Sequence, residues 1–263
     1  MTTDEIVQTA HALADAAREA ILPFFRSAGM RADNKAGTGF DPVTEADRAA
    51  ERAMREILAA RRPQDGILGE EYGATRGESG LTWVLDPIDG TRAFLSGTPT
   101  WGVLIAVSDE SGPVYGLIDQ PYTAERFEGG FGRAGMQGPQ GRRALATLGA
   151  RPLSEAILFT TFPELGSEAE RDGFAAVARE VKLTRYGMDC YAYALVACGQ
   201  VDLVIEAGLQ AYDIQAPIAV IEAAGGIVTD WQGRPAHQGG RAVAAAGPEQ
   251  HAAALEILSK VAG

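Results

Sequence analysis

The chain has 263 residues, enough for one large domain or two modest ones around a substantial buried core. Hydrophobic residues make up 46% and charged residues 22%, which is ordinary for a globular protein. The net charge of −12 argues against nucleic acids and anionic membrane surfaces as main partners, but not against a small phosphorylated molecule, because metal ions reverse the local sign of an acidic site.

The first half of the chain begins with two predicted helices. Thr2 and Glu5 fit a capping box ahead of apolar residues at helical spacing. Residues 34–44 contain several glycines and a proline, which predicts a loop. Thr44 then opens a second helix that runs to about Arg61.

After the second helix the pattern changes to short strands and turns. Runs of apolar and β-branched residues between turn residues predict strands over residues 67–69, 81–85, 102–108 and 114–120. The glycine-rich region 129–141 predicts turns around a hairpin.

The second half alternates strand and helix, which is typical of an α/β fold. Predicted strands cover residues 157–161, 201–206, 226–230 and 242–245. Predicted helices cover residues 167–180, 190–198, 214–223 and 248–260. We expect a boundary without a flexible linker that divides the chain into residues 1–147, with most of the acidic motifs, and residues 148–263, which complete the site.

Cysteine usage and the apolar runs bear on the compartment. Only Cys190 and Cys198 occur, so free thiols in a reducing compartment are the simplest interpretation. The N-terminus lacks the pattern of a secretory signal, and no apolar run is long enough to cross a bilayer. We therefore expect a cytoplasmic protein.

The stretch WVLDPIDGTRAF, residues 83–94, carries the strongest chemical signal. It sets Asp86 and Asp89 around Pro87 at the end of a predicted strand, where α/β proteins usually hold their sites. Because proline fixes its own φ and lacks an N–H, the Ile88 carbonyl can turn away from the sheet and point where both carboxylates point. A ligand set made only of oxygens selects hard cations, Mg²⁺ or Mn²⁺.

An anion site is expected beside these ligands. Gly90 and Thr91 stand at a predicted helix start, where free backbone N–H groups and the helix dipole suit a phosphate. Other carboxylates stand at further loop ends: Glu70, Glu71, Asp47 and Asp213. This arrangement favours two or more divalent ions with a phosphate ester between them.

Each pattern also has a simpler interpretation on its own. An isolated Asp-Pro-x-Asp-Gly is usually only a turn. Glu70-Glu71 alone fits a solvated charged loop, and Thr44 or Asp213 fits a helix N-cap. Their combination in one chain favours the metal and phosphate interpretation.

In this order the motifs resemble the inositol-monophosphatase family of Mg²⁺-dependent phosphatases. The resemblance rests on DPVTEAD at 41–47, GEE at 69–71, the long aspartate motif at 83–91, and the segment 212–226 with its aspartate and EAAGG. It covers nearly the whole chain. The fold it implies is an α/β five-layer α/β/α/β/α sandwich of the inositol-monophosphatase/fructose-bisphosphatase type.

The resemblance implies two or three Mg²⁺ ions, for which Mn²⁺ can substitute. Glu70, Asp86 and the Ile88 carbonyl would hold the first ion. Asp86, Asp89 and Asp213 would hold the second, and a third would sit near Glu70 through water.

The resemblance also assigns catalytic roles. Thr91, hydrogen-bonded to Asp47, would orient the attacking water together with Glu70. The amides of Gly90 and Thr91 would hold the phosphate. The positions beside the metals would be Glu71 and Lys35.

Two segments resemble the histidinol-phosphate phosphatase branch of the family: TRAF at 91–94 and GMDCYAY at 187–193. We therefore expect hydrolysis of L-histidinol phosphate to L-histidinol and phosphate, a step of histidine biosynthesis, by a homodimer. The alternatives are an inositol-1-monophosphatase or a broader sugar-phosphate phosphatase. A metal-binding protein without activity is disfavoured, because every expected side-chain ligand position holds a carboxylate.

Three residues are candidates for recognising this substrate. Asp189 stands where the inositol branch has a small neutral residue, and Glu206 matches a position facing the non-phosphate end of the substrate. Two acids there favour a cationic ligand. Arg92 would hold the phosphate or Asp189, or lie on the surface, and Asp189 would alternatively cap the helix that begins near Cys190.

Overall fold

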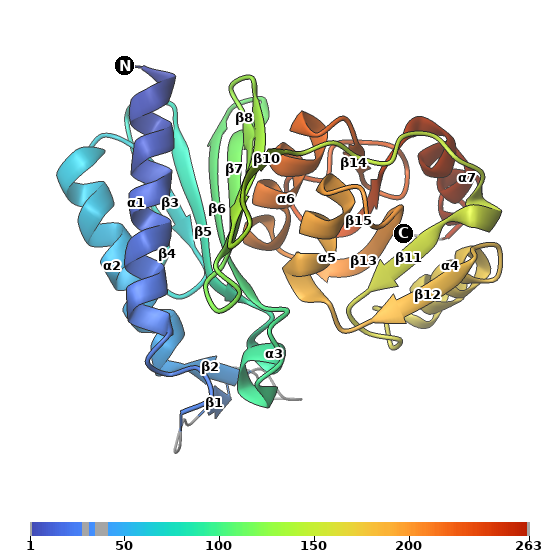
Figure 1. The fold of residues 1–263 in the computed structure, drawn as a ribbon, viewed down its shortest axis with the longest axis horizontal. Coiled ribbons are helices and arrows are strands. Elements are labelled where there is room, and N and C mark those ends of the chain that lie inside the picture. The colour runs from blue at the N-terminus through green and yellow to red at the C-terminus, as the bar shows by residue number, and fades with distance from the viewer. Residues whose placement is uncertain (1, 28–31, 35–41, 262–263) are drawn as a thin grey trace.

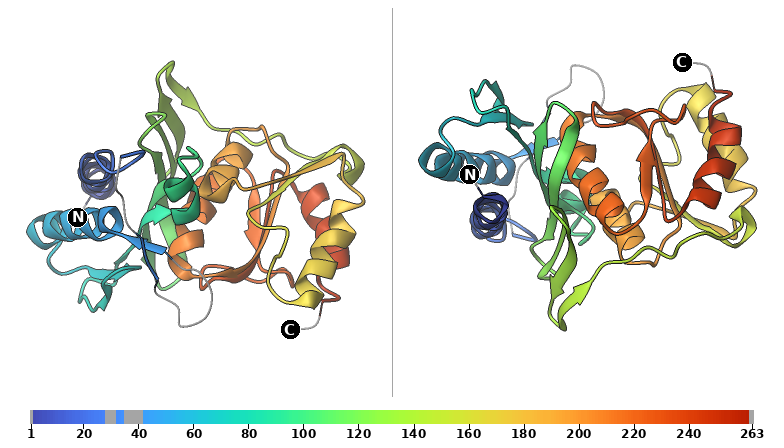
Figure 2. Two further views of the ribbon diagram at one scale, coloured as in Figure 1. Left: turned by 90° about the horizontal axis from the view of Figure 1, so that it is seen from below. Right: turned by 90° about the horizontal axis from the view of Figure 1, so that it is seen from above.

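The computed structural model describes residues 2–27, 32–34 and 42–261 (Figure 1). The two larger sheets, of eight and five strands, alternate with three pairs of helices. Seen from above and below, the order of layers is helices, large sheet, helices, small sheet, helices (Figure 2). The predicted α/β/α/β/α sandwich is confirmed.

The first layer holds α1 (Thr3–Ile21) and α2 (Glu45–Arg61), which pack side by side against the large sheet (Figure 2). The predicted capping box is present, because the Glu5 N–H donates to the Thr2 hydroxyl at 3.3 Å and the Thr2 N–H donates to the Glu5 carboxylate. Each helix buries an apolar stripe at helical spacing, which is why the periodicity of the sequence predicts both correctly.

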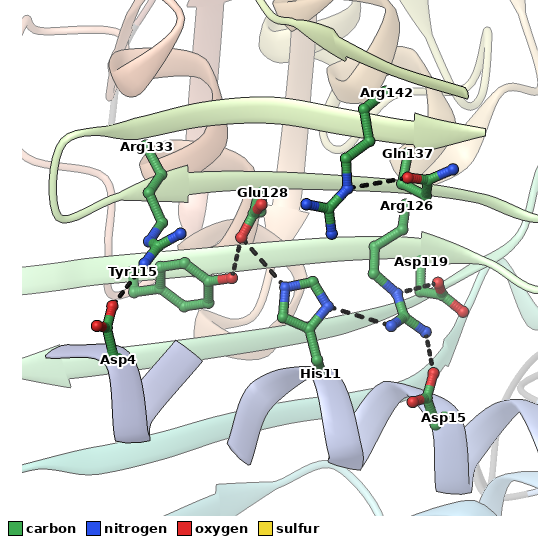
Figure 3. A network of polar contacts seen from close by, with 10 residues as sticks. All are labelled: Asp4, His11, Asp15, Tyr115, Asp119, Arg126, Glu128, Arg133, Gln137 and Arg142. Atoms are coloured by element: carbon green, nitrogen blue, oxygen red, sulfur yellow. Dashed lines mark hydrogen bonds and ion pairs between the residues drawn. The ribbon is translucent and has the colours of Figure 1, made fainter. Parts of the chain in front are cut away.

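Polar contacts also join α1 to the large sheet (Figure 3). The His11 ring lies 3.2 Å from the Glu128 carboxylate, which also accepts from the Tyr115 hydroxyl at 2.8 Å. Arg126 donates to Asp119 on the neighbouring strand at 2.7 Å. Since Asp119 is fully buried, its pairing with arginine offsets the loss of its hydration.

The large sheet has the order β10-β9-β8-β7-β6-β5-β3-β4. Its strands are β3 (Gly66–Gly69), β4 (Gly73–Thr75), β5 (Thr82–Asp89), β6 (Gly102–Asp109), β7 (Gly112–Gln120), β8 (Glu125–Gly130), β9 (Arg133–Gly138) and β10 (Gly141–Ala144). Only β3 and β5 pair in parallel. The predicted turns around a hairpin at residues 129–141 are present, and the structure corrects only the extent of the strands, which cover most of this region.

A second correction concerns the predicted loop at residues 34–44. Its ends belong to two short strands, β1 (Ala32–Asn34) and β2 (Pro42–Thr44), which pair antiparallel. Strands of three residues carry no readable periodicity, so the sequence did not indicate them. Lys35 lies outside the described residues.

The inner helices are α5 (Asp189–Ala197) and α6 (Ala211–Ala223), between the two sheets. The small sheet has the order β12-β11-β13-β15-β14, with bounds β11 (Ile157–Thr160), β12 (Leu183–Tyr186), β13 (Leu203–Leu209), β14 (Ile227–Thr229) and β15 (Gly240–Ala245). The outer helices are α4 (Glu168–Ala178) and α7 (Pro248–Leu258). A short helix, α3 (Thr91–Ser96), and a 3₁₀ turn, η1 (Leu153–Glu155), complete the described elements.

Helix α6 joins the two predicted halves, because it packs on strands β5 to β8 and on β14. Two glycines make the close approach possible: a Cβ on Gly116 would lie 2.4 Å from the Ala216 carbonyl oxygen, and one on Gly129 would lie 2.5 Å from the Ala219 carbonyl oxygen. The division at residues 147 and 148 falls between β10 and β11 and stays a prediction. No described helix is long and apolar enough to cross a membrane.

We predict that Gly116→Ala lowers the free energy of unfolding by about 1–3 kcal/mol, the usual range for overpacking a core. The new methyl group must push α6 away from β7. Urea denaturation measures the change. Gly135→Ala in β9 of the same sheet is the control, because its Cβ has its nearest neighbour at 3.7 Å; equal stability of the two variants would contradict the prediction.

Candidate active site

A pocket of about 290 Å³ opens where the two predicted halves meet. The end of β5 and the start of α3 form one wall, and α5, the end of β13 and the start of α6 form the other. The pocket brings together most of the predicted site residues: Glu70, Asp86, Ile88, Asp89, Gly90, Thr91, Arg92, Asp189, Glu206 and Asp213.

Three carboxylates converge on one side of the pocket. One oxygen each of Asp86, Asp89 and Asp213 lie within 4.8 Å of one another. In a regular strand residues 86 and 89 would face opposite sides of the sheet. The pairing of β5 with β6 shifts register between them, at the position of Pro87, so both side chains reach the same volume.

The structure corrects two boundaries around this cluster. The predicted strand ended at residue 85, but β5 continues through Asp89, so the aspartate motif is itself part of the sheet. Helix α6 begins at Ala211, so Asp213 lies inside its first turn. There Asp213 accepts the Gln210 N–H at 2.7 Å, which fixes the side chain at the N-terminal end of the helix without making it the N-cap.

The negative charges of these carboxylates repel one another. Burial raises the pKa of Asp86 well above its ordinary value, and the charges of Glu70, Asp89 and Asp213 raise it further. Burial raises the pKa of Asp213 to about 7. Among the described residues, one carboxylate oxygen of Asp86 is buried without a hydrogen-bond partner. Buried, mutually repelling oxygens of this kind fit a divalent cation of the Mg²⁺ type.

A second acidic group, Asp47, Glu70 and Glu71, also has ligand atoms within 4.8 Å of one another. Glu70 lines the pocket, and its charge acts on Asp86. The Glu71 carboxylate lies 3.5 Å from the Arg48 guanidinium. The ligand set Glu70, Asp86 and Ile88 for a first ion stays a prediction.

Sequence reasoning missed Glu51, which holds the Glu70-Glu71 segment in place. Glu51 is fully buried on α2 and accepts the N–H groups of Glu71 at 2.7 Å and Tyr72 at 3.3 Å. The signal was available, because Glu51 follows Asp47 by four residues and so shares its face of the helix. Gly69 leaves the space that the Glu51 carboxylate fills.

The expected helix start after the aspartate motif is confirmed. Gly90 is the N-cap of α3 with φ of 83°, a conformation that favours glycine. The Thr91 hydroxyl donates to the Ile88 carbonyl at 3.2 Å. The phosphate cradle and the hydrogen bond between Thr91 and Asp47 stay predictions.

Helix α5 approaches the aspartate motif from the other half. The Cys190 N–H donates to the Asp89 carboxylate at 2.6 Å, so Asp89 pairs with one of the N–H groups that are free at the start of the helix. Asp189 is the first residue of α5, with φ of 46°, and its carboxylate accepts from the Thr100 hydroxyl at 3.0 Å. The alternative of Asp189 as N-cap is therefore wrong, since Met188 is the N-cap and has no side-chain cap bond.

Glu206 and Arg92 lie on opposite walls. Glu206 is buried and accepts the Thr161 N–H at 2.6 Å, and burial raises its pKa to about 7. Burial raises the pKa of Asp189 to about 6, while the charge of Arg92 lowers it. The exposed Arg92 guanidinium lies over the Phe162 ring at 4.7 Å, which links the two walls of the pocket.

Further residues at the site were not predicted, among them Thr100, Phe162, Glu164 and Tyr193. Phe162 and Glu164 follow β11, which pairs in parallel with β13. Sites in α/β folds lie at the carboxyl ends of parallel strands, and this rule could have indicated both residues. Tyr193 comes one helical turn after Asp189 and so shares its face of α5.

A family model described as the inositol monophosphatase family matches residues 2–262. The chain is 43% identical to the chloroplastic bifunctional phosphatase IMPL2 of Arabidopsis thaliana, over 88% of this chain and 66% of that protein. It is 34% identical to histidinol-phosphatase of Mycobacterium tuberculosis, over 94% and 95% of the two chains. A solved inositol monophosphatase from Zymomonas mobilis has a TM-score of 0.86 and 38% identity, covering 98% of this chain and 99% of that one.

We predict that Asp86→Asn weakens Mg²⁺ binding by roughly a hundredfold, since even outer-shell partners of a metal contribute ten- to hundredfold. Isothermal titration calorimetry measures the affinity directly. Asp109→Asn, at the exposed last residue of β6, is the matched control and should bind Mg²⁺ like the wild type. Equal affinities of the two variants would rule out Asp86 as a ligand.

We also predict that stability without metal falls as pH rises from about 4 to about 7. The pKa of Asp213 is raised from 3.8 to about 7 in the fold. In that window the native state therefore holds a proton that the unfolded chain has released, and this stabilisation is lost as pH rises. The Tm in chelator should be lower at pH 8 than at pH 6, and Mg²⁺ should raise the Tm more at pH 8.

The control for this pH series is Asp213→Asn, in which both the pH slope and the gain from Mg²⁺ should shrink. A parallel Tm measurement with KCl of equal ionic strength in place of Mg²⁺ separates metal binding from screening of charges by salt. A Tm in chelator that rises from pH 6 to pH 8 would contradict the assignment.

Proposed function

Because the chain belongs to the inositol monophosphatase family, we propose that this phosphatase hydrolyses L-histidinol phosphate to L-histidinol and phosphate with Mg²⁺ as its cofactor. The proposal includes a homodimer in the cytoplasm that serves histidine biosynthesis. It is supported by the histidinol-phosphatase relative and, above all, by the surplus of acids in the pocket.

The surplus of acids is the observation that supports histidinol phosphate as the substrate. Beyond the Asp86, Asp89 and Asp213 cluster, the pocket is lined by Asp189, Glu206 and Glu164. Histidinol phosphate carries an ammonium and an imidazole beside its phosphate, whereas inositol phosphate carries only hydroxyls. Hydrogen bonds between such cationic groups and carboxylates are worth roughly 1.5–3 kcal/mol each when desolvated, and of these three acids Glu206 is buried.

The residues present fit the metal that this chemistry needs. Asp86, Asp89 and Asp213 would hold one Mg²⁺, and Glu70 with Asp86 and the Ile88 carbonyl would hold another. Bound there, Mg²⁺ supplies Lewis acidity that lowers the pKa of water and neutralises charge on the leaving oxygen.

The chain's own residues position the reactants. Thr91 and Glu70, with Asp47 behind them, would orient the attacking water. The Gly90 and Thr91 N–H groups at the start of α3 would bind phosphate oxygens. Since water is the nucleophile, no covalent link between enzyme and phosphate forms.

A second candidate substrate is inositol 1-phosphate. The Zymomonas mobilis inositol monophosphatase shares 38% identity over nearly the whole chain. In addition, burial raises the pKa of Asp189 to about 6 and that of Glu206 to about 7. At lower pH both acids would be partly protonated and would donate hydrogen bonds to substrate hydroxyls.

We predict that Asp189→Ala lowers kcat/KM for histidinol phosphate by roughly ten- to a hundredfold, through loss of one charge-assisted hydrogen bond. Hydrolysis of p-nitrophenyl phosphate, which lacks a cationic group, should stay within about twofold. Steady-state kinetics with both substrates tests this. Asp172→Ala, an exposed acid on α4, should change neither value.

Two results would speak against the proposal. Equal losses for both substrates would make Asp189 a residue that shapes the site without recognising the substrate. A wild-type protein that prefers inositol 1-phosphate to histidinol phosphate would replace the proposed substrate by the second candidate.

A further inference from the structure

Tyr193 is a buried tyrosine whose hydroxyl is not explained by the fold. Its side chain is 4% exposed and lines the pocket from α5. Among the described residues, its hydroxyl oxygen is buried and has no hydrogen-bond partner. Buried polar groups are almost always paired, so an unpaired hydroxyl that borders a pocket points to a partner in the pocket.

The surroundings of this hydroxyl are acidic. Burial raises the pKa of Tyr193 well above its ordinary value, and the charges of Glu206, Asp89 and Asp213 raise it further, in that order. The hydroxyl therefore keeps its hydrogen and lies near both Glu206 and the metal-ligand cluster. It can donate one hydrogen bond and still accept another on its oxygen.

Packing alone does not account for the hydroxyl, as a second tyrosine on the same helix shows. Tyr191 donates its hydroxyl hydrogen to the Glu125 carboxylate at 2.6 Å, and its ring packs edge-on against Phe127. Its polar atom is used by the fold. A phenylalanine at position 193 would fill the same space without burying an unpaired oxygen, so the hydroxyl of Tyr193 needs a different reason.

We propose that Tyr193 is a specificity residue that binds the α-ammonium group of the substrate. When the substrate binds, the hydroxyl oxygen accepts a hydrogen bond from the ammonium. In histidinol phosphate the ammonium stands on the carbon next to the CH₂ of the phosphate ester, between the phosphate and the imidazole. Tyr193 lines the same pocket as Asp89 and Asp213 of the carboxylate cluster and as Glu206.

This inference rests on the proposed function and narrows it to phosphate esters of vicinal amino alcohols. The test compares histidinol phosphate with its deamino analogue, 3-(imidazol-4-yl)propyl phosphate, which lacks only the ammonium. In Tyr193→Phe we expect kcat/KM for histidinol phosphate to fall roughly ten- to a hundredfold, mainly through KM, as for other sites built to hydrogen-bond a charged group. The value for the deamino analogue should stay within about twofold.

Thermal stability provides a readout that separates recognition from structure. Removing an unpaired buried hydroxyl should leave the Tm of Tyr193→Phe unchanged or raise it. Tyr191→Phe is the matched control: it loses the bond to Glu125, so its Tm should fall, while its preference between the two substrates should match the wild type.

The outcomes distinguish the two proposals. If the wild type prefers inositol 1-phosphate to histidinol phosphate, the proposed function has failed, and if it hydrolyses histidinol phosphate without preferring it to the deamino analogue, only the binding of the ammonium is overturned. If the wild type shows the preference and Tyr193→Phe retains it, only the assignment of Tyr193 is overturned. A lower Tm together with equal losses on both substrates would overturn it as well, by making Tyr193 structural.

Discussion

Repulsion between buried carboxylates is the constraint on which the site depends. Asp86, Asp89 and Asp213 have oxygens within 4.8 Å of one another, and burial raises the pKa of each. Without a cation such a cluster destabilises the fold. The surrounding structure must therefore hold these side chains together, and a bound divalent ion would turn the repulsion into attraction.

The packing of the two halves supplies that restraint. Helix α6 carries Asp213 and rests directly on the backbone of the large sheet, because Gly116 and Gly129 have no side chains to separate them. Asp89 accepts the Cys190 N–H in the first turn of α5, so one metal-ligand candidate also joins the halves. Displacing either inner helix would alter both the cluster of Asp86, Asp89 and Asp213 and the pocket wall that α5 and α6 form.

Several local features that are unfavourable for stability gather at the pocket. Asp189 has a positive φ, and a Cβ on Gly90 would lie 2.8 Å from the Asp189 side chain, so this contact tolerates only glycine. Tyr193 buries an unpaired hydroxyl. Strain and unpaired polar groups are expected at functional sites, where the shape that binds a ligand differs from the one that is most stable.

The sequence by itself indicated the layer order through its resemblance to a known family. Periodicity and short motifs, which are local properties of the chain, indicated most helices and strands and the acids Asp86, Asp89 and Asp213. The sequence did not indicate that β5 continues to Asp89 with a shifted register, since a bulge depends on the neighbouring strand. It did not reveal Glu51 or Tyr193 as site residues either. Their importance comes from contacts and neighbours distant in sequence, Glu71 for one and Glu206 for the other, and only tertiary packing decides these.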